Sequence, residues 1–418
     1  MRRALTLLSA LLVAACSSAG PPPTATSRAS TVADPTPTVT TTSSPTPTAI
    51  WTPTEIPSAT VVAPPSQAAS CAASTLASLT EAQRIGQLFA VGLAHDRFDP
   101  AARDAVERDH IGSWWFTEKT SAGVDAIRTV ADAVQAHATD AATGGVGFFI
   151  AANQEGGMIQ ALSGPGFDRI PSAVTQGSWP AATLRQRAER WGRQLLDAGV
   201  NLDFAPVADV VPRGSEQENA PIGELKREFG SDPRAVAGSV GAFIDGMQAA
   251  GVATTAKHFP GLGRVAANTD FASGVVDTVT TPDDPYLTPF RRAVDHGVSA
   301  VMMSLATYER IDPDRLAAFS WPTIGGILED DLGFTGIVMS DSLSAEAVTS
   351  IPAGTRAVAF LADGGDMIVV RPVDVAVDMV KAVTAHAKES DWFRRRIDNA
   401  ALHVLRAKDA AGLLPCSA

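Results

Sequence analysis

The chain has 418 residues, of which 45% are hydrophobic and 19% are charged, and its formal net charge is −12 at pH 7. This acidic balance argues against nucleic acid as a partner, because a phosphate backbone is bound by basic patches. Beyond the N-terminal segment no apolar run is long enough to cross a bilayer, which excludes a multi-spanning membrane protein.

Met1 is followed by two arginines and by an apolar run over residues 4–15 that is too short to span a bilayer comfortably. The run ends in Val13-Ala14-Ala15-Cys16, which resembles the lipobox of bacterial lipoproteins. We therefore predict a lipoprotein signal peptide over residues 1–15 and a lipid on Cys16 that anchors the protein to the outer face of the cytoplasmic membrane. An ordinary secretion signal with an incidental cysteine is the alternative.

Residues 16–72 are dominated by Pro, Thr, Ser and Ala. Such a segment has little apolar surface to bury, so it cannot offset the entropy lost on ordering. We predict a disordered tether over residues 16–72 and one globular domain over residues 73–418.

Strand-like and helix-like segments alternate through the globular region. Periodic, helix-like segments cover residues 182–198, 234–250, 289–296 and 355–361 and the chain after about residue 385. Short apolar runs typical of buried strands cover residues 87–92, 111–116, 146–151, 200–205, 252–256, 300–304, 336–339 and 366–370. Eight strands with intervening helices predict an α/β fold with a parallel sheet closed into a (β/α)8 TIM barrel.

A nucleotide-binding α/β fold is the competing architecture. The pairs Gly144-Gly145 and Gly156-Gly157 form neither the dinucleotide fingerprint nor a phosphate-binding loop with its lysine and hydroxyl. The barrel is therefore favoured.

Two cysteines, Cys71 and Cys416, flank the predicted domain. The ends of a closed barrel lie near each other, and an exported protein meets an oxidising environment, so a disulfide between them is geometrically reasonable. Two free thiols are the alternative.

Polar side chains follow several of the predicted strands, where the catalytic mouth of a barrel lies. Lys257 and His258 come directly after the fifth strand, and their alternative role is that of a surface lysine and a satisfied core histidine. Arg227 precedes a helix that starts at residues 231–233, and its alternative is a surface arginine. For Glu155 and Asp203 we favour a structural role, because ion-pair networks also line such mouths.

Asp341 ends the seventh predicted strand and is flanked by Ser340 and Ser342. A carboxylate held at this position by a rigid element can act as a nucleophile on an anomeric carbon. The alternative is a helix N-cap, but Ser342 or Ser344 could serve as that cap and leave Asp341 free.

Taken together, these motifs resemble glycoside hydrolase family 3, in particular its single-domain β-N-acetylhexosaminidases of the NagZ type. The resemblance extends from about residue 79 to the final helix. It rests on Asn-Gln-Glu-Gly-Gly at 153–157, Asp-Phe-Ala-Pro-Val at 203–207, Arg-Glu-Phe-Gly-Ser-Asp-Pro at 227–233, Lys-His-Phe-Pro-Gly at 257–261 and Ser-Asp at 340–341. The lipobox and the tether look like the actinobacterial lipoprotein branch of that family.

The resemblance implies a retaining exo-β-N-acetylglucosaminidase with Asp341 as the nucleophile. Arg227, Lys257, His258 and Asn153 would bind the terminal N-acetylglucosamine (GlcNAc), and no metal or organic cofactor is expected. The implied substrates are GlcNAc-containing saccharides and muropeptides released in cell-wall turnover, and the implied state is a monomer.

Three positions depart from the family pattern. Asn268-Thr269-Asp270 stands where Asp-Ser-His supplies the usual acid/base histidine, so we assign that role to Asp270. A carboxylate can fill it only if burial or a neighbouring charge raises its pKa, or if loop motion brings it to the leaving oxygen. In addition, Asn153 replaces an aspartate, and Ala161 replaces an arginine.

These departures leave two other functions open. One is a catalytically weakened or non-enzymatic lipoprotein that binds cell-wall sugar. The other is an enzyme in which phosphate, rather than water, accepts the glycosyl group.

Overall fold

A computed structural model of the protein describes residues 70–416. The predicted signal peptide, Cys16 and nearly all of the predicted tether lie outside the described residues. Between residues 70 and 416 no helix is both long enough and apolar enough to cross a membrane.

Eight parallel strands form one sheet in which each strand pairs with the next one along the chain, in the order β1-β2-β3-β6-β7-β9-β12 on one side and β1-β13 on the other. A parallel bridge between Met339 and Met367 joins the last two strands and closes the sheet. The strands are β1 (Phe89–Leu93), β2 (Ser113–Phe116), β3 (Phe149–Ala152), β6 (Leu202–Asp203), β7 (Ala253–Phe259), β9 (Ala300–Met303), β12 (Ile337–Ser340) and β13 (Ile368–Val370). All eight overlap the predicted strands, which confirms the (β/α)8 barrel.

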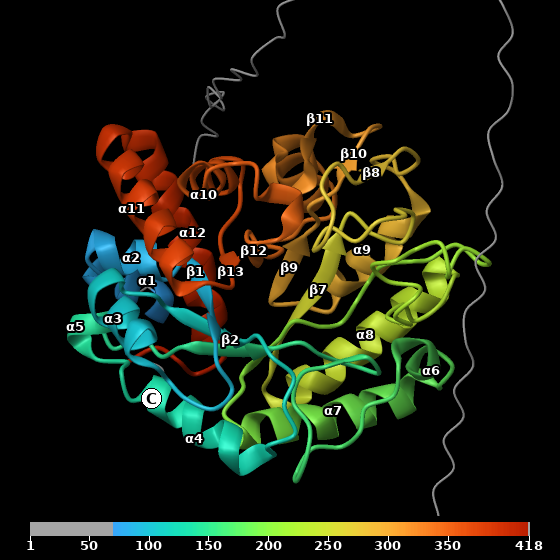
Figure 1. Ribbon diagram of the computed structural model, residues 1–418, viewed down its shortest axis with the longest axis horizontal. Coiled ribbons are helices and arrows are strands. Elements are labelled where there is room, and N and C mark those ends of the chain that lie inside the picture. The colour runs from blue at the N-terminus through green and yellow to red at the C-terminus, as the bar shows by residue number, and fades with distance from the viewer. Residues whose placement is uncertain (1–69, 417–418) are drawn as a thin grey trace, which may run out of the picture. The chain divides into compact units, whose positions relative to one another are not determined.

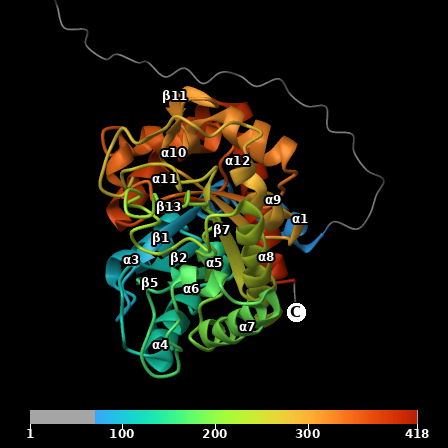
Figure 2. The same cartoon turned by 90° about the vertical axis from the view of Figure 1, so that its right-hand side faces the viewer.

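Helices lie around the outside of the strands in both views (Figures 1 and 2). The predicted helices are confirmed to within two residues, except that the last one starts later than expected. The longer helical segments are α3 (Pro100–Asp109), α4 (Val124–Gln135), α7 (Ala181–Asp197), α8 (Pro233–Ala250), α9 (Thr288–Asp295), η3 (Pro322–Asp331), α10 (Ala353–Ala362), α11 (Val373–Glu389) and α12 (Asp391–Ala410).

Short elements fill the connections. Two additional small sheets are formed by β4 (Gln154–Gly156) with β5 (Ile159–Gln160), and by β8 (Val276–Asp277), β10 (Thr307–Tyr308) and β11 (Asp312–Leu316). The short helices are α1 (Cys71–Ser78), α2 (Glu81–Gly86), α5 (Asp140–Thr143), α6 (Ala173–Gly177), η1 (Pro285–Leu287), η2 (Ala317–Phe319) and η4 (Glu346–Val348).

Strand β7 extends further than the sequence predicts. Lys257 and His258 belong to the strand itself, and all seven of its residues are buried. Its ladder continues because the Lys257 N–H donates to the Pro206 carbonyl over 3.1 Å and the Ser304 N–H donates to the Phe259 carbonyl over 2.8 Å. The peptide bond between Lys257 and His258 is cis.

The N-terminal ends of three strands are joined by one buried cation from the last helix. Lys408 of α12 donates from Nζ to Gln87 Oε1 over 2.7 Å, to the Gly112 carbonyl over 2.7 Å and to the Gly147 carbonyl over 2.9 Å. Burial lowers the pKa of this ammonium group to about 7. Its three donors are matched by three acceptors, so the ammonium group itself is satisfied.

The two ends of the described chain meet at the same side of the barrel. A disulfide joins Cys71 to Cys416, whose Cα atoms lie 5.9 Å apart. The side chains of Ala72, Leu79, Val146, Leu405 and Leu414 form a small apolar cluster beside it. The predicted disulfide is therefore present, but the predicted boundary after residue 72 is wrong. Residues 71 and 72 lie in α1, because Ser70 caps this helix and the disulfide holds its first residue.

Removing this disulfide should destabilise the barrel. The bridge closes almost the whole domain into one loop, so a Cys71→Ser, Cys416→Ser double variant should lose about 2–5 kcal/mol of unfolding free energy. The measurement is chemical denaturation with Cys16 replaced in every variant, so that only this pair differs. Equal stability of the parent protein under oxidising and reducing conditions would contradict the prediction.

Candidate active site

A cavity of about 690 Å³ opens at the C-terminal ends of the barrel strands. This volume lies within the range of small-molecule sites, and the position is where the catalytic groups of TIM barrels gather. Its charged or titratable lining side chains are Arg227, Lys257, His258, Asp270, Asp341 and Arg371. Its aromatic lining side chains are Trp115, Phe204 and Phe271.

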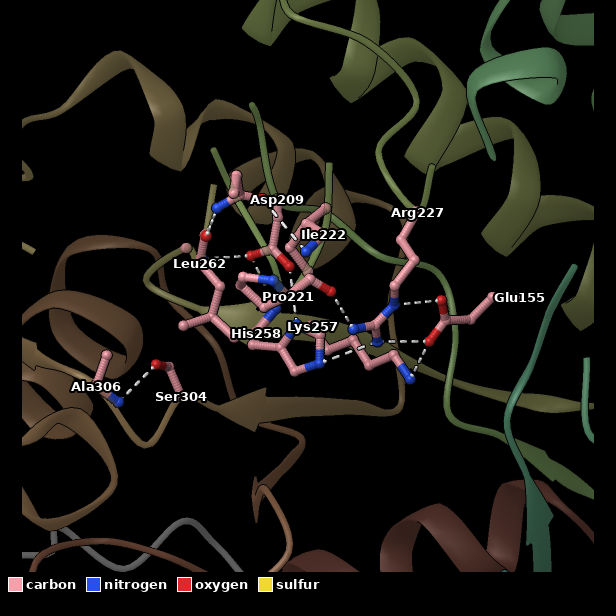
Figure 3. Close-up of polar contacts among 12 residues, drawn as sticks. Glu155, Asp209, Pro221, Ile222, Arg227, Lys257, His258, Leu262, Ser304 and Ala306 are labelled. Atoms are coloured by element: carbon pink, nitrogen blue, oxygen red, sulfur yellow. Dashed lines mark hydrogen bonds and ion pairs between the residues drawn. The ribbon is translucent and has the colours of Figure 1, made fainter. Parts of the chain in front are cut away.

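Glu155 of β4 holds two of these cations in place (Figure 3). Its carboxylate accepts from Arg227 Nε and Nη2, both over 2.8 Å, and Oε1 lies 2.6 Å from Lys257 Nζ. Burial alone would raise the pKa of Glu155, but the charges of Arg227 and Lys257 outweigh it and lower that pKa to about 2. The carboxylate is thus charged throughout the neutral range. The structural role favoured from the sequence fits these contacts.

The predicted binding residues Lys257 and Asn153 lie together. Lys257 Nζ donates to Asn153 Oδ1 over 2.8 Å, and only 2% of the lysine side chain is exposed. Asn153 thus fills a cation-binding position with a neutral oxygen, while Glu155 supplies the full charge. The backbone carbonyl of Asn153 accepts from the N–H of Ala161, so the two departures from the family pattern, at 153 and 161, are adjacent across one turn.

His258 is oriented by Asp209, to which the sequence analysis assigned no role. The imidazole Nδ1 lies 2.8 Å from Asp209 Oδ2, and Oδ1 of the same carboxylate accepts from the backbone N–H groups of His258 and Leu262. A carboxylate only accepts, so Nδ1 carries the hydrogen. His258 Nε2 then faces Arg227 Nη2 at 3.4 Å. The signal for Asp209 was a second carboxylate just beyond a strand end.

Asp203 lies beneath the cavity. It is fully buried, and Oδ1 accepts from the Gln154 N–H over 3.0 Å, whereas Oδ2 has no partner in the described part of the chain. Burial raises its pKa to about 7. It supports the β4 loop and does not line the cavity, which fits the structural role expected for it.

Asp341 directly follows β12 and is half-buried in the cavity wall. Its Oδ1 accepts from the Ser342 N–H over 2.7 Å, and no cation of residues 70–416 forms an ion pair with it. It caps no helix, because the next long helix, α10, begins at Ala353 behind Pro352. The helix-cap alternative for Asp341 is therefore wrong.

Ser342 and Ser344, either of which could have served as a cap, do not cap a helix, since η4 begins behind Ala345. Their hydroxyls lie 2.9 Å apart, and Ser344 Oγ accepts from the backbone N–H of Arg371 over 3.0 Å. The physical reason is that this loop has to reach the neighbouring strand before the helix starts, and the serine pair joins the loop that follows Asp341 to the end of β13.

Asp270 lies on the exposed loop after β7, on the same cavity as Asp341. Its carbonyl and that of Thr269 accept from the N–H groups of Glu346 and Ala347, over 3.3 and 3.1 Å. The loop is thereby fastened to the segment that follows Asp341. Partial burial raises the pKa of Asp270, and the negative charge of Asp341 raises it further.

Comparison with known proteins assigns the chain to a family. Residues 80–407 match the glycosyl hydrolase family 3 N-terminal domain. The chain belongs to glycosyl hydrolase family 3. This membership confirms the resemblance seen in the motifs, whereas the lipoprotein branch stays a prediction.

Among its family 3 relatives, the chain is 34% identical over 272 residues to a β-hexosaminidase of Xylella fastidiosa strain M12, covering 63% of this chain and 76% of the relative. A solved β-N-acetylhexosaminidase from Beutenbergia cavernae DSM 12333 is 44% identical, has a TM-score of 0.78, and covers 79% of this chain and 98% of its own. A family 3 β-N-acetylglucosaminidase from a Paenibacillus strain is 27% identical with a TM-score of 0.74, over 80% of this chain and 63% of its own.

Between residues 70 and 416 no group of three or more His, Cys, Asp or Glu side chains is arranged to hold a metal ion. The cavity holds the carboxylate of Asp341 near Arg227 and Lys257, which both pair with Glu155.

Replacing Glu155 by Gln should destabilise the protein and weaken sugar binding. The change leaves Arg227 and Lys257 buried without their counter-charge, which costs about 3–5 kcal/mol in comparable buried pairs. Because the pKa of Glu155 is depressed to about 2 in the folded state, its contribution is present above the unfolded-state pKa and is lost as pH falls toward 2. Denaturation measured between neutral and acidic pH tests the loss of stability and its pH dependence, and calorimetry with GlcNAc tests the loss of sugar binding.

Asp168→Asn is the matched control, because Asp168 pairs with Arg190 over 2.8 Å on the surface. An exposed pair contributes about 0–1 kcal/mol. Equal losses in the two variants would contradict the role given to Glu155.

Proposed function

We propose that this chain is a retaining exo-β-N-acetylglucosaminidase that releases terminal β-linked GlcNAc. The observation that carries the proposal is that two carboxylates, Asp341 and Asp270, line one cavity together with Arg227, Lys257 and His258. Family 3 membership and the β-hexosaminidases among the relatives support it.

Asp341 is the nucleophile in this proposal. Its carboxylate attacks the anomeric carbon, the bond from that carbon to the leaving oxygen breaks, and a glycosyl-aspartate forms. Asp270 donates its proton to the leaving oxygen in the same step. In the second step Asp270 takes a proton from water, the water oxygen bonds to the anomeric carbon, and Asp341 is released with GlcNAc.

The different surroundings of the two carboxylates suit these roles. A general acid must be protonated when substrate binds, and partial burial together with the charge of Asp341 raises the pKa of Asp270. Asp341 accepts the Ser342 N–H with Oδ1, which fixes the orientation of the carboxylate in the cavity wall. Arg227 and Lys257 are already paired with Glu155, so they do not neutralise the nucleophile and can donate to sugar hydroxyls.

The cellular setting belongs to the proposal as well. We propose that the substrates are fragments of peptidoglycan and that Cys16 anchors the protein to the outer face of the cytoplasmic membrane. The residues before Cys16 support the anchor, and the disulfide between Cys71 and Cys416 supports residence in an oxidising compartment.

Asp341→Asn should abolish turnover of an aryl β-GlcNAc, because an amide is a poor nucleophile. Loss of a nucleophile costs on the order of 10⁴–10⁶-fold in kcat. A fluorinated GlcNAc analogue should label Asp341 in the parent protein, as read by peptide mass spectrometry. Asp197→Asn, an exposed carboxylate at the end of α7, should behave like the parent. Unchanged turnover in the Asp341 variant would rule out this mechanism.

Asp270→Asn should slow cleavage of a GlcNAc disaccharide about 10²–10⁴-fold, the usual contribution of general acid–base catalysis. An activated aryl leaving group needs less protonation, so the aryl glycoside should lose less in its first step. In the parent, kcat/KM plotted against pH should fall at alkaline pH as Asp270 loses its proton. The variant should lack this alkaline decrease, which is the alkaline limb of the profile. Equal losses on both substrates with the limb retained would assign the acid role to another group.

A further inference from the structure

Arg371 is a cavity-lining cation that the mechanism above does not use. It directly follows β13, is exposed, and lines the same cavity as Asp341. Its guanidinium lies over the ring of Trp115, 5.6 Å from the ring centroid. Within residues 70–416 no carboxylate forms an ion pair with it, whereas Arg227 and Lys257 share Glu155. The N–H edge of Arg371 is therefore available to a ligand.

The backbone of Arg371 is held on a rigid part of the barrel. Its N–H donates to Ser344 Oγ over 3.0 Å, and the Leu343 N–H donates to the Val369 carbonyl over 2.8 Å. On the other side β1 approaches so closely that a Cβ at Gly92 would lie 2.3 Å from the Arg371 carbonyl oxygen. The residue is thus fixed between β1 and the loop that carries Asp341. A planar guanidinium stacked on an aromatic ring is also partly pre-organised for two parallel hydrogen bonds.

Side-chain exposure separates the floor of the cavity from its mouth. The Lys257 and Arg227 side chains are 2% and 12% exposed, whereas Phe271, next to Asp270, is 81% exposed. An exo-acting enzyme places the terminal sugar on the deep, donor-rich floor, so the leaving portion of the substrate occupies the mouth. Arg371 is an exposed, unpaired cation in that outer part.

We propose that Arg371 is a specificity-determining residue that binds a carboxylate on the leaving portion of the substrate. This inference rests on the proposed hydrolase function and extends it to the other side of the scissile bond. A guanidinium matches a carboxylate with two parallel N–H donors. A cation is needed there because the protein, with a net charge of −12 and the Asp341 carboxylate in the cavity, otherwise repels an acidic saccharide.

The test compares three GlcNAc β-glycosides on the parent protein, Arg371→Ala and Arg371→Lys. Their leaving groups are a sugar bearing a lactyl carboxylate (N-acetylmuramic acid), the same sugar with that carboxylate converted to its amide, and an aryl group. Arg371→Ala should lower kcat/KM for the acid about tenfold, the lower range for a charged hydrogen-bonded pair because the site is exposed. Values for the amide and the aryl glycoside should stay within about twofold. Arg371→Lys should keep part of the preference, and added salt should weaken it in the parent.

Arg187→Ala is the matched control. Arg187 is also exposed and also stacks on a tryptophan, 4.6 Å from the Trp179 ring centroid, but it lies on α7 outside the cavity. This variant should keep the parent's preference for the acid over the amide. A loss of preference there equal to that of Arg371→Ala would overturn the proposal.

Three other results would overturn it. Equal losses on all three substrates would give Arg371 a structural role, and no loss on any would remove it from recognition. Formation of GlcNAc-1-phosphate in phosphate buffer, abolished by Arg371→Ala, would assign the residue to an acceptor anion instead.

If the parent cleaves none of the substrates, the proposed hydrolase function fails by itself. In that case calorimetry with N-acetylmuramic acid and its amide still tests Arg371. The parent protein should bind the acid more tightly than the amide, and Arg371→Ala should bind the two equally.

Discussion

The cavity of this protein depends on one buried carboxylate placed between two cations. Glu155 accepts from Nε and Nη2 of Arg227 and pairs with Lys257, and the three groups come from three separate segments of the chain. Two buried cations without a counter-charge would repel each other and would lose their solvation. With Glu155 between them they can lie on the floor of the cavity as fixed donors. Neither cation forms an ion pair with Asp341.

The remaining charged groups are held by contacts between loops. Asp209 orients His258, the serine pair after Asp341 is tied to Arg371, and the loop carrying Asp270 is fastened by backbone bonds to residues 346 and 347. His258 and Arg371 are each held from the loop of the adjacent strand, whereas the Asp270 loop is held from the segment after β12, two strands away from β7. This arrangement follows from the barrel, because only the C-terminal ends of parallel strands bring so many loops to one place.

In the proposed mechanism a carboxylate, Asp270, takes the acid/base role that histidine has in the family pattern, and its surroundings differ accordingly. A histidine needs little help, since its ordinary pKa lies near neutrality. An aspartate needs partial removal from water and a negative neighbour, and Asp270 has both. Of the three departures, Asn153 and Asp270 line the cavity, whereas Ala161 is buried and does not line it. The group formed by Glu155, Arg227 and Lys257 follows the family pattern.

Much of the architecture could be predicted from the sequence alone. Apolar runs of strand length, separated by helical periodicity, determined the order and type of the elements, because burial on both faces leaves a continuous apolar pattern. The motifs at the strand ends identified Lys257, His258, Arg227, Asn153 and Asp341 as cavity residues, and the two flanking cysteines predicted the disulfide. What only the tertiary structure decided was pairing across the barrel. Residues far apart in the chain meet in each of these contacts: Glu155 with two cations, Asp209 with His258, and Lys408 with three strand ends. The position of Arg371 beside Trp115 is a further example. Local patterns carry no information on such pairs, because their energies arise only when closure of the sheet brings the charges within a few ångströms of each other and out of water.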